Sequence, residues 1–406
     1  MAVANPQRDF QVIEKEDAKE AMEYVQKHGV SNLSTYLQHK IEQWKEVAIN
    51  IGIVGEAGVG KSSFINTVRN LNGDDEGAAP VGVVETTTEP TPYPHPFNSK
   101  VIFWDLPGVG TLRYPKEYYL EAIGVERYDF FVILSDRRFT SHDGWLAEML
   151  LQRKKPFFFV RTKFDEAIED KSEIDPEVIR HKIVTDAHRS LKALKLKNCQ
   201  IYVISNFEPD SFEFPILMDS IFMTLPDLKS QAMVFTLGTF CHSVIKEKKT
   251  FLKSRIWKVA TLSAAGGAIP IPGLDIGVDI TLLVFETKFY LEQFGLDDDS
   301  MTHLAERTGT TVDYYKDAII KSRSILLARG GITSTIKGII LKQALKDCPR
   351  KFLKWIPFIG SVVNAATSFG TTYYFLDKLI EDLSTDAHSV LDRVTQRQVG
   401  NATRID

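Results

Sequence analysis

The sequence predicts an α/β domain built on a mostly parallel sheet, together with an all-helical region in the rest of the chain. Between residues 48 and 226, short apolar runs alternate with segments of helical periodicity, which is typical of a parallel sheet covered on both faces. After residue 226 the strand-like runs disappear and helical patterns continue, broken at glycine and proline. We therefore expect N-terminal helices in 1–47, the α/β domain in 48–226 and a C-terminal helical domain in 227–406.

The expected strands are short apolar runs rich in Ile, Val and Phe. Most of them end at a glycine, a serine or an acidic residue, and their length favours buried strands over buried helices. Helical patterns at 62–71, 143–153 and 176–195 separate several of them. The strands are expected at 48–54, 100–104, 129–135, 156–161 and 200–205.

The helical parts lie at both ends of the chain. Two helices are expected between residues 7 and 48, and because they have no place in the alternating pattern, we expect them to pack against the C-terminal helical domain. The C-terminal helices are expected at 231–260, 275–294, 300–307, 311–323, 333–346 and 358–384. Residues 384–406 are polar and are expected to end as a frayed helix.

The composition is that of an ordinary globular protein. The 406 residues are 44% apolar and carry a formal net charge of −4, which excludes a disordered chain and a collagen-like chain. It also argues against a basic protein that coats nucleic acid, so no nucleic-acid partner is expected. Cys199, Cys241 and Cys348 fit neither a metal motif nor a disulfide framework, which indicates a reducing, cytoplasmic compartment.

Two apolar stretches in the C-terminal half need an explanation. Residues 264–283 contain two acids and two prolines, so a buried helical hairpin is favoured over a membrane span. Residues 355–376 are uncharged and contain a proline and an asparagine; a core helix or an amphipathic helix on a membrane surface both fit. The basic residues before that stretch fit anionic headgroups or a solvated turn equally well: Lys346, Arg350, Lys351 and Lys354.

The first apolar run is followed by a complete phosphate-binding motif, GxxxxGK[ST]. It lies between a predicted strand and a predicted helix, as this motif requires. Its curled backbone would direct N–H groups at phosphate oxygens, Lys61 would contact the β- and γ-phosphates, and Ser62 would hold Mg²⁺. The predicted nucleotide-binding residues here are Gly55, Glu56, Ala57, Gly58, Val59, Gly60, Lys61, Ser62 and Ser63.

Three further motifs follow later strands and select guanine nucleotides. Asp105 and Gly108 form DxxG, where the acid would hold Mg²⁺ through water and Gly108 would meet the γ-phosphate. Thr162, Lys163 and Asp165 form TKxD, in which the carboxylate accepts hydrogen bonds from the guanine N1–H and amino group. Ser205 and Asn206 follow the last strand, where a backbone N–H would meet guanine O6. Together these motifs predict a GTP- and GDP-binding site with Mg²⁺.

The segment between the phosphate loop and Asp105 contains three consecutive threonines, 86–88. One of them would serve as the switch threonine that binds Mg²⁺, although a β-branched edge strand is the alternative. Ras-type GTPases carry a glutamine just after DxxG to orient water, and here Val109 and Gly110 stand instead. Intrinsic hydrolysis is therefore expected to be slow unless Glu85, a partner or a second copy assists.

These residues resemble the immunity-related GTPases, an interferon-inducible, dynamin-like family, and the GKS phosphate loop places the chain with its effector subgroup. The resemblance spans roughly the whole chain. It rests on the sequences at 55–66, 75–87, 101–110, 128–135, 157–165, 214–221 and 248–257.

The resemblance implies a Ras-like GTPase domain with an all-α helical domain formed by the N- and C-terminal segments. It implies GTP-dependent self-assembly through the GTPase-domain face, other family GTPases as possible regulators, and peripheral recruitment to membranes around intracellular pathogens. It also assigns activation to Glu85 and the switch role, with Mg²⁺ binding, to Thr87. Ala2 departs from the Met-Gly start that permits myristoylation, so that anchor is not expected. Phe207 departs from the lysine that the family can carry there.

Two functions are compatible with these features. The first is a GTPase that is activated by its own assembly on membranes of pathogen vacuoles or microbes. The alternative is a GTP-loaded membrane-associated switch or scaffold whose hydrolysis is incidental. A nucleotide kinase or transport ATPase is disfavoured by the TKFD sequence at 162–165.

Overall fold

The computed structural model describes residues 10–29, 32–82, 89–111, 113–137, 139–193, 196, 199–265, 280–322, 332–344 and 363–402. The chain divides into two compact units. The first contains residues 1–5 and 45–244, and the second contains residues 6–44 and 245–406. The division falls at 244 rather than at the expected 226, since α9 (Asp227–Thr236) packs against strand β3 (Asn98–Asp105) of the first unit.

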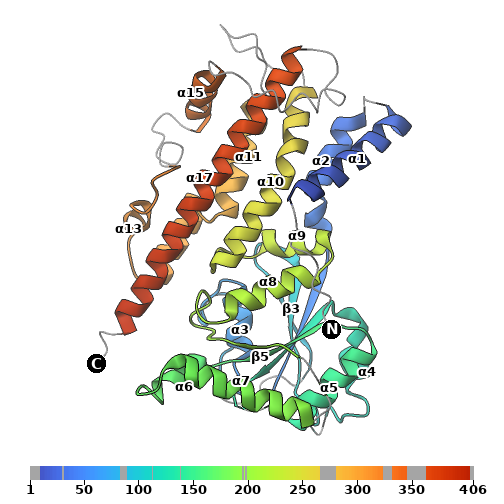
Figure 1. Cartoon of the computed structure of the whole chain (residues 1–406), viewed down its shortest axis with the longest axis vertical. Helices are drawn as coiled ribbons and strands as arrows, with labels where there is room; N and C mark the ends of the chain where they lie inside the picture. The colour runs from blue at the N-terminus through green and yellow to red at the C-terminus, as the bar shows by residue number, and fades with distance from the viewer. Residues whose placement is uncertain are drawn as a thin grey trace. The chain divides into compact units, whose positions relative to one another are not determined.

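The first unit is a six-stranded sheet with the strand order β2-β3-β1-β4-β5-β6 (Figure 1). The strands β1 (Ile49–Val54), β3, β4 (Phe130–Ser135), β5 (Phe157–Arg161) and β6 (Ile201–Val203) are parallel. They match the five predicted strands. The antiparallel strand β2 (Thr91–His95) was not predicted, since Pro92 and Pro94 argue against a strand; it lies at the edge of the sheet, where proline is tolerated.

Helices cover both faces of this sheet. One face packs on α4 (Tyr119–Ile123), α5 (Ser141–Gln152) and α7 (Pro176–Ala193) in a single apolar core. On the other face, side chains of α3 (Lys61–Val68), α8 (Phe214–Thr224) and α9 meet those of β1, β3 and β4. The short helices η3 (Val125–Arg127) and α6 (Phe164–Glu169) complete the unit. The fold is therefore the Ras-like α/β class.

The second unit joins the two ends of the chain. It contains α1 (Phe10–His28), α2 (Leu33–Glu42), α10 (His242–Ala265), α11 (Ile280–Gln293), α12 (Asp298–Arg307), α13 (Val312–Lys316), α15 (Ile332–Ala344) and α17 (Val363–Ala402), while η2 (Gln43–Glu46) leads into β1. Leu33 and Leu37 pack with Trp257, Ala260 and Phe369. The apolar face of the N-terminal helices is therefore buried by C-terminal helices, and both ends of the chain share one unit.

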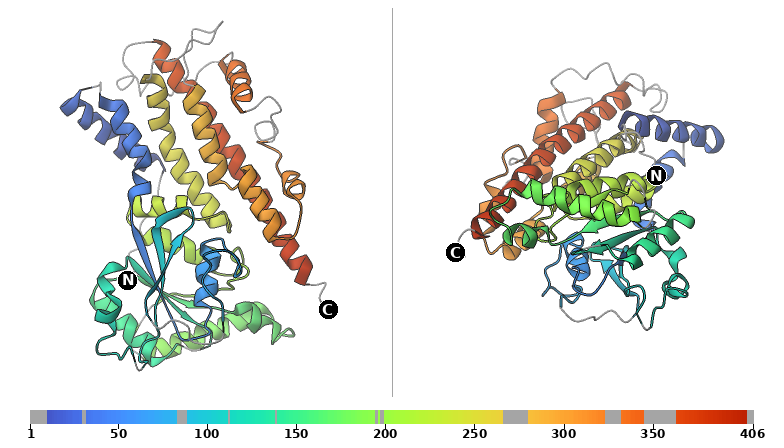
Figure 2. Two further views of the ribbon diagram at one scale, coloured as in Figure 1. Left: turned by 180° about the vertical axis from the view of Figure 1, so that it is seen from behind. Right: turned by 60° about the horizontal axis from the view of Figure 1, so that its bottom comes forward.

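The long helix α17 differs from the prediction at its C-terminal end. It continues to Ala402, past the expected end at 384, because Ala387, Val390, Leu391 and Val394 extend its buried stripe. Residues 355–362 of the uncharged stretch lie outside the described residues, but 363–376 form the start of α17. There Phe369 and Leu376 are fully buried, and Figure 2 shows α17 beside α10. Within the described part of the chain, no helix has the length and apolar character needed to cross a membrane.

A charged network in the second unit connects α2, α10 and α11. The guanidinium of Arg255 binds both oxygens of Glu286, at 2.6 and 3.0 Å, and donates to the carbonyl oxygen of Ile41 at 2.8 Å. It also lies 4.6 Å from the ring centre of Phe289. Both charged side chains are at most 5% exposed. One buried cation therefore links an N-terminal helix to two C-terminal ones.

The amine of Lys248 on α10 is also buried, and we expect its burial to make the stability of the chain depend on pH. Lys248 is 3% exposed, and its Nζ donates to the carbonyl oxygen of Gln293, the last residue of α11, at 2.7 Å. Burial lowers the pKa of Lys248 from 10.5 to about 7. Between those values the unfolded chain binds more protons than the folded one, so the free energy of unfolding rises with pH.

We expect wild type to gain stability relative to Lys248→Met as the pH increases from 7 to 10. Urea unfolding at several pH values would measure this difference. Lys246→Met is the matched control, since Lys246 is exposed on the same helix. A difference between wild type and Lys248→Met that stays flat, or decreases with pH, would contradict the prediction.

Candidate functional site

The loop of residues 55–60 joins β1 directly to the start of α3. Gly58 and Gly60 have φ angles of 80° and 90°, in the left-handed region that side chains rarely tolerate. A Cβ atom on Gly55 would lie 2.6 Å from the carbonyl oxygen of Leu134, so only glycine fits there. The loop thus has the curled backbone that presents N–H groups to phosphate, at the N-terminus of a helix.

The side chains of this loop are placed as a phosphate site requires. Glu56 and Ala57 are exposed at its tip, and Val59 is buried beneath it. Lys61 bends back over the loop, where its Nζ donates to the carbonyl oxygens of Gly55 and Glu56, both at 3.0 Å. Ser62 and Ser63 follow in the first turn of α3 and are partly exposed. The ammonium is therefore already held where phosphate oxygens would meet it.

The DxxG segment lies beside the phosphate loop. Asp105 ends β3 opposite Ile53 of β1, and the next N–H, that of Leu106, donates to the carbonyl oxygen of Ile53 at 2.9 Å. A Cβ atom on Gly108 would lie 3.8 Å from the carbonyl oxygen of Gly55. Asp105 and Gly108 thus lie next to the loop that holds Lys61, as the motifs predict.

The residue after DxxG is buried and cannot orient water. Val109 is 9% exposed and packs into the core on the side of α4 and α5. Gly110 follows with a φ of 82°, and its Cα lies so close to the ring of His142 that a Cβ would be 2.6 Å from Cε1. Neither residue offers a polar side chain, which agrees with the expectation from the sequence.

His142 is a residue that the sequence did not identify. It lies in the first turn of α5. Asp143, the residue after it, forms a capping box with Thr140 at the start of that helix. Burial raises the pKa of Asp143, and the nearby carboxylate of Glu56 in the phosphate loop acts in the same direction. The start of α5 is therefore close to both the phosphate loop and the segment after DxxG. No motif marks this arrangement, because it depends on how α5 packs.

Thr162 holds the phosphate loop in place. Its side chain is fully buried, and its Oγ1 donates to the carbonyl oxygen of Val59 at 2.7 Å. Its N–H donates to the carbonyl oxygen of Ser135 at the end of β4, at 2.9 Å. The threonine of TKxD thus connects the loop to the sheet, and its hydroxyl is engaged in that contact.

The carboxylate of Asp165 has the free acceptor that a guanine site needs. Its Oδ1 atom is buried and has no hydrogen-bond partner among the described residues. Lys163, which precedes it by two residues, has a φ of 56°, a left-handed conformation that costs energy and is common at functional sites. The Nζ of Lys163 lies 3.7 Å from Glu166 and 3.9 Å from Asp136. The carboxylate is thus available to accept from the guanine N1–H and amino group.

The Ser205–Asn206 loop is hydrogen-bonded to the other two loops. The Nδ2 atom of Asn206 donates to the carbonyl oxygen of Gly60 at 3.0 Å, and the N–H of Phe164 donates to that of Ile204 at 3.2 Å. Ser205 is fully buried, and its Oγ accepts from the N–H of Phe207 at 3.1 Å. The structure therefore brings the phosphate loop, TKxD and Ser205–Asn206 together in one cluster.

The residues present fit a magnesium ion that is bound together with nucleotide. The hydroxyl of Ser62 and, through water, the carboxylate of Asp105 would hold it, while phosphate oxygens would complete its shell. Among the described residues no group of three His, Cys, Asp or Glu side chains could hold a metal without them. Glu85 and Thr87, the two predicted switch residues, lie outside the described residues.

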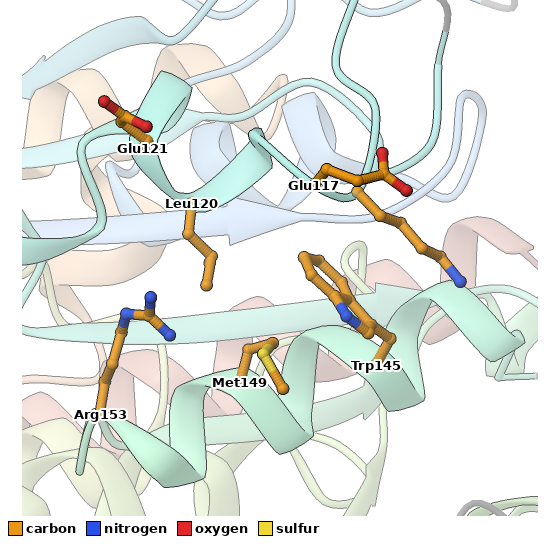
Figure 3. A pocket seen from close by; sticks show the side chains of 7 residues that line it. Glu117, Leu120, Glu121, Trp145, Met149 and Arg153 are labelled. Carbon is orange, nitrogen blue, oxygen red and sulfur yellow. The ribbon is translucent and has the colours of Figure 1, made fainter.

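A groove of about 350 Å³ lies elsewhere on the first unit, between the segment leading into α4 and the helix α5 (Figure 3). None of the predicted nucleotide-binding residues lines it. Trp145, Met149 and Leu120 form its apolar part, and Glu121 and Arg153 lie at one end.

Comparison with known proteins assigns a family. Residues 14–394 match the family model described as interferon-inducible GTPase (IIGP). The chain is 34% identical over 349 residues to interferon-inducible GTPase 5 of Bos taurus, covering 84% of this chain and 74% of that protein. It is 32% identical over 372 residues to interferon-inducible GTPase 1 of Mus musculus, covering 89% and 87%.

Among solved structures, the chain has a weaker likeness to Toc33 of Arabidopsis thaliana in complex with Mg²⁺ and GMPPNP. The TM-score is 0.30 at 16% identity, over 52% of this chain and 92% of that one.

Proposed function

Because the chain belongs to the interferon-inducible GTPase family, and is therefore a GTPase, we propose that its hydrolysis of GTP is slow in the monomer and is activated by GTP-dependent self-assembly. The observation that supports this is the burial of Val109, which leaves the site without a side chain that orients water after DxxG. In this proposal a second copy meets the nucleotide-bearing face and completes the site in trans. Mg²⁺, when bound, would neutralise charge on the β- and γ-phosphates.

Each part of the described site has a role in this proposal. The loop of residues 55–60 and Lys61 bind the phosphates, and Ser62 with Asp105 orients the metal. Asp165 selects guanine through its unpaired oxygen. Glu85 is proposed to act in activation and Thr87 in sensing the γ-phosphate. We further propose that assembly takes place on membranes of pathogen vacuoles or microbes, to which the cytoplasmic chain is recruited peripherally, with other family GTPases as regulators.

The alternative is a GTP-loaded membrane-associated switch or scaffold whose hydrolysis is incidental. Both proposals use the same nucleotide site, so affinity measurements do not separate them. They differ in whether hydrolysis depends on contact between copies, since an incidental activity belongs to each monomer alone.

We expect GTP turnover per molecule to rise several-fold as protein concentration increases, in parallel with light scattering from the same samples. Glu85→Ala should still bind GDP but lose this rise. Glu173→Ala is the control, because Glu173 is an exposed glutamate in the segment before α7. A specific activity that is flat with concentration would favour the scaffold, and wild-type-like turnover in Glu85→Ala would remove that residue from the mechanism.

A further inference from the structure

A large aromatic side chain lies exposed at the nucleotide site. Phe207 is 68% exposed, although the two residues before it, Ser205 and Asn206, are at most 6% exposed. Its backbone is held, since its N–H donates to Ser205 Oγ and Asn206 is bonded to Gly60. An aromatic ring on a fixed backbone that is mostly open to water offers a flat apolar face to a ligand.

The surroundings of Phe207 place that ring beside the guanine pocket. The N–H of Phe164, between Lys163 and Asp165, donates to Ile204, so the two loops run together. Glu208, the residue after Phe207, is close enough to Asp165 that their charges interact, and burial raises the pKa of Glu208. Phe207 therefore belongs to a segment that lies next to Asp165, the residue that would bind the edge of the guanine base.

The residue before Asp165 is anchored in the core. Phe164 is 2% exposed, and its ring meets that of Phe212 edge-on, with centres 4.9 Å apart. The backbone that carries Asp165 is thus anchored in the core of the unit. A base bound at its edge by Asp165 still exposes two faces, and an aromatic face is a strong and base-tolerant partner for one of them.

We propose that Phe207 stacks on a face of the bound guanine and is a positioning residue for GDP and GTP. This rests on the guanine site described above. The stacking adds affinity without selecting the base, whereas Asp165 selects the base through hydrogen bonds. The two contributions can therefore be separated by comparing GDP with IDP, whose hypoxanthine has the same ring system but lacks the amino group that Asp165 would bind.

The test measures GDP, GTP and IDP affinity by calorimetry at a protein concentration where the chain is monomeric. Phe207→Ala should weaken all three by the same factor, about 5- to 100-fold, and Phe207→Tyr should retain the wild-type affinity. Asp165→Ala should instead reduce the preference for GDP over IDP. Phe97→Ala is the control, since Phe97 is a 55% exposed phenylalanine of the same unit.

Three outcomes would overturn the proposal. Unchanged GDP affinity in Phe207→Ala would show that the ring does not touch the base. A changed ratio of GDP to IDP affinity would assign it to base selection. An effect confined to concentrations at which copies associate would make it an assembly contact. Absence of GDP binding by the wild type would refute the nucleotide site itself, which is a separate result.

Discussion

Replacing Lys61 with alanine should lower the affinity for GDP and GTP by at least about 100-fold, because it removes the cation that the loop holds ready for phosphate. The ammonium is fixed by the carbonyl oxygens of Gly55 and Glu56, both at 3.0 Å, before nucleotide arrives. Little ordering energy is then needed on binding, so most of the charge interaction contributes to affinity.

Thermal unfolding distinguishes this loss from damage to the fold. Nucleotide at 100 times the wild-type Kd should stabilise the wild type by ~2.7 kcal/mol and should stabilise Lys61→Ala by at most about 0.4 kcal/mol at the same concentration. The melting temperature without nucleotide should be similar in both. Lys192→Ala is the control, since Lys192 is exposed on α7. Micromolar or tighter GTP binding by Lys61→Ala would refute the assignment of the phosphate loop.

The motifs of the proposed nucleotide site can be recognised in the sequence because they are local. Each group of residues from Gly55 to Ser63, and from Thr162 to Asp165, is contiguous and follows an apolar strand, so spacing alone identifies it. The contacts that join these groups were not predictable. Thr162 donates a hydrogen bond to Val59, and Asn206 donates one to Gly60, although the partners lie far apart in the sequence. Such pairs depend on how the strands are ordered in the sheet.

The errors in the fold prediction have a related cause. The strand β2 was missed because it contains Pro92 and Pro94. Proline is tolerated only in an edge strand, and a single sequence does not show which strand lies at the edge of a sheet. Val394 lies in a polar segment, and only packing shows that it continues the buried stripe of α17.

Breaking the buried ion pair of the helical unit should have the largest effect on stability. Glu286→Leu should destabilise that unit by about 3–5 kcal/mol, because it leaves the charge of Arg255 buried without its partner. Arg255→Met should destabilise the unit by a similar amount. It leaves the carboxylate of Glu286 buried without its cation, and the carbonyl oxygen of Ile41 without its donor.

The double variant Arg255→Met/Glu286→Leu should be much more stable than the sum of the two single changes implies. Removing both charges abolishes the cost of burying either one, and the methionine can still contact Phe289. Hydrogen exchange of α2 should report the remaining defect, because Ile41 loses its donor in Arg255→Met and in the double variant but keeps it in Glu286→Leu. The surface pair Lys378–Asp382, 2.7 Å apart, is the matched control and should show a coupling below about 1 kcal/mol. If the Arg255 and Glu286 changes are simply additive, the pair does not act as a unit, and the link between α2 and the C-terminal helices rests on apolar packing alone.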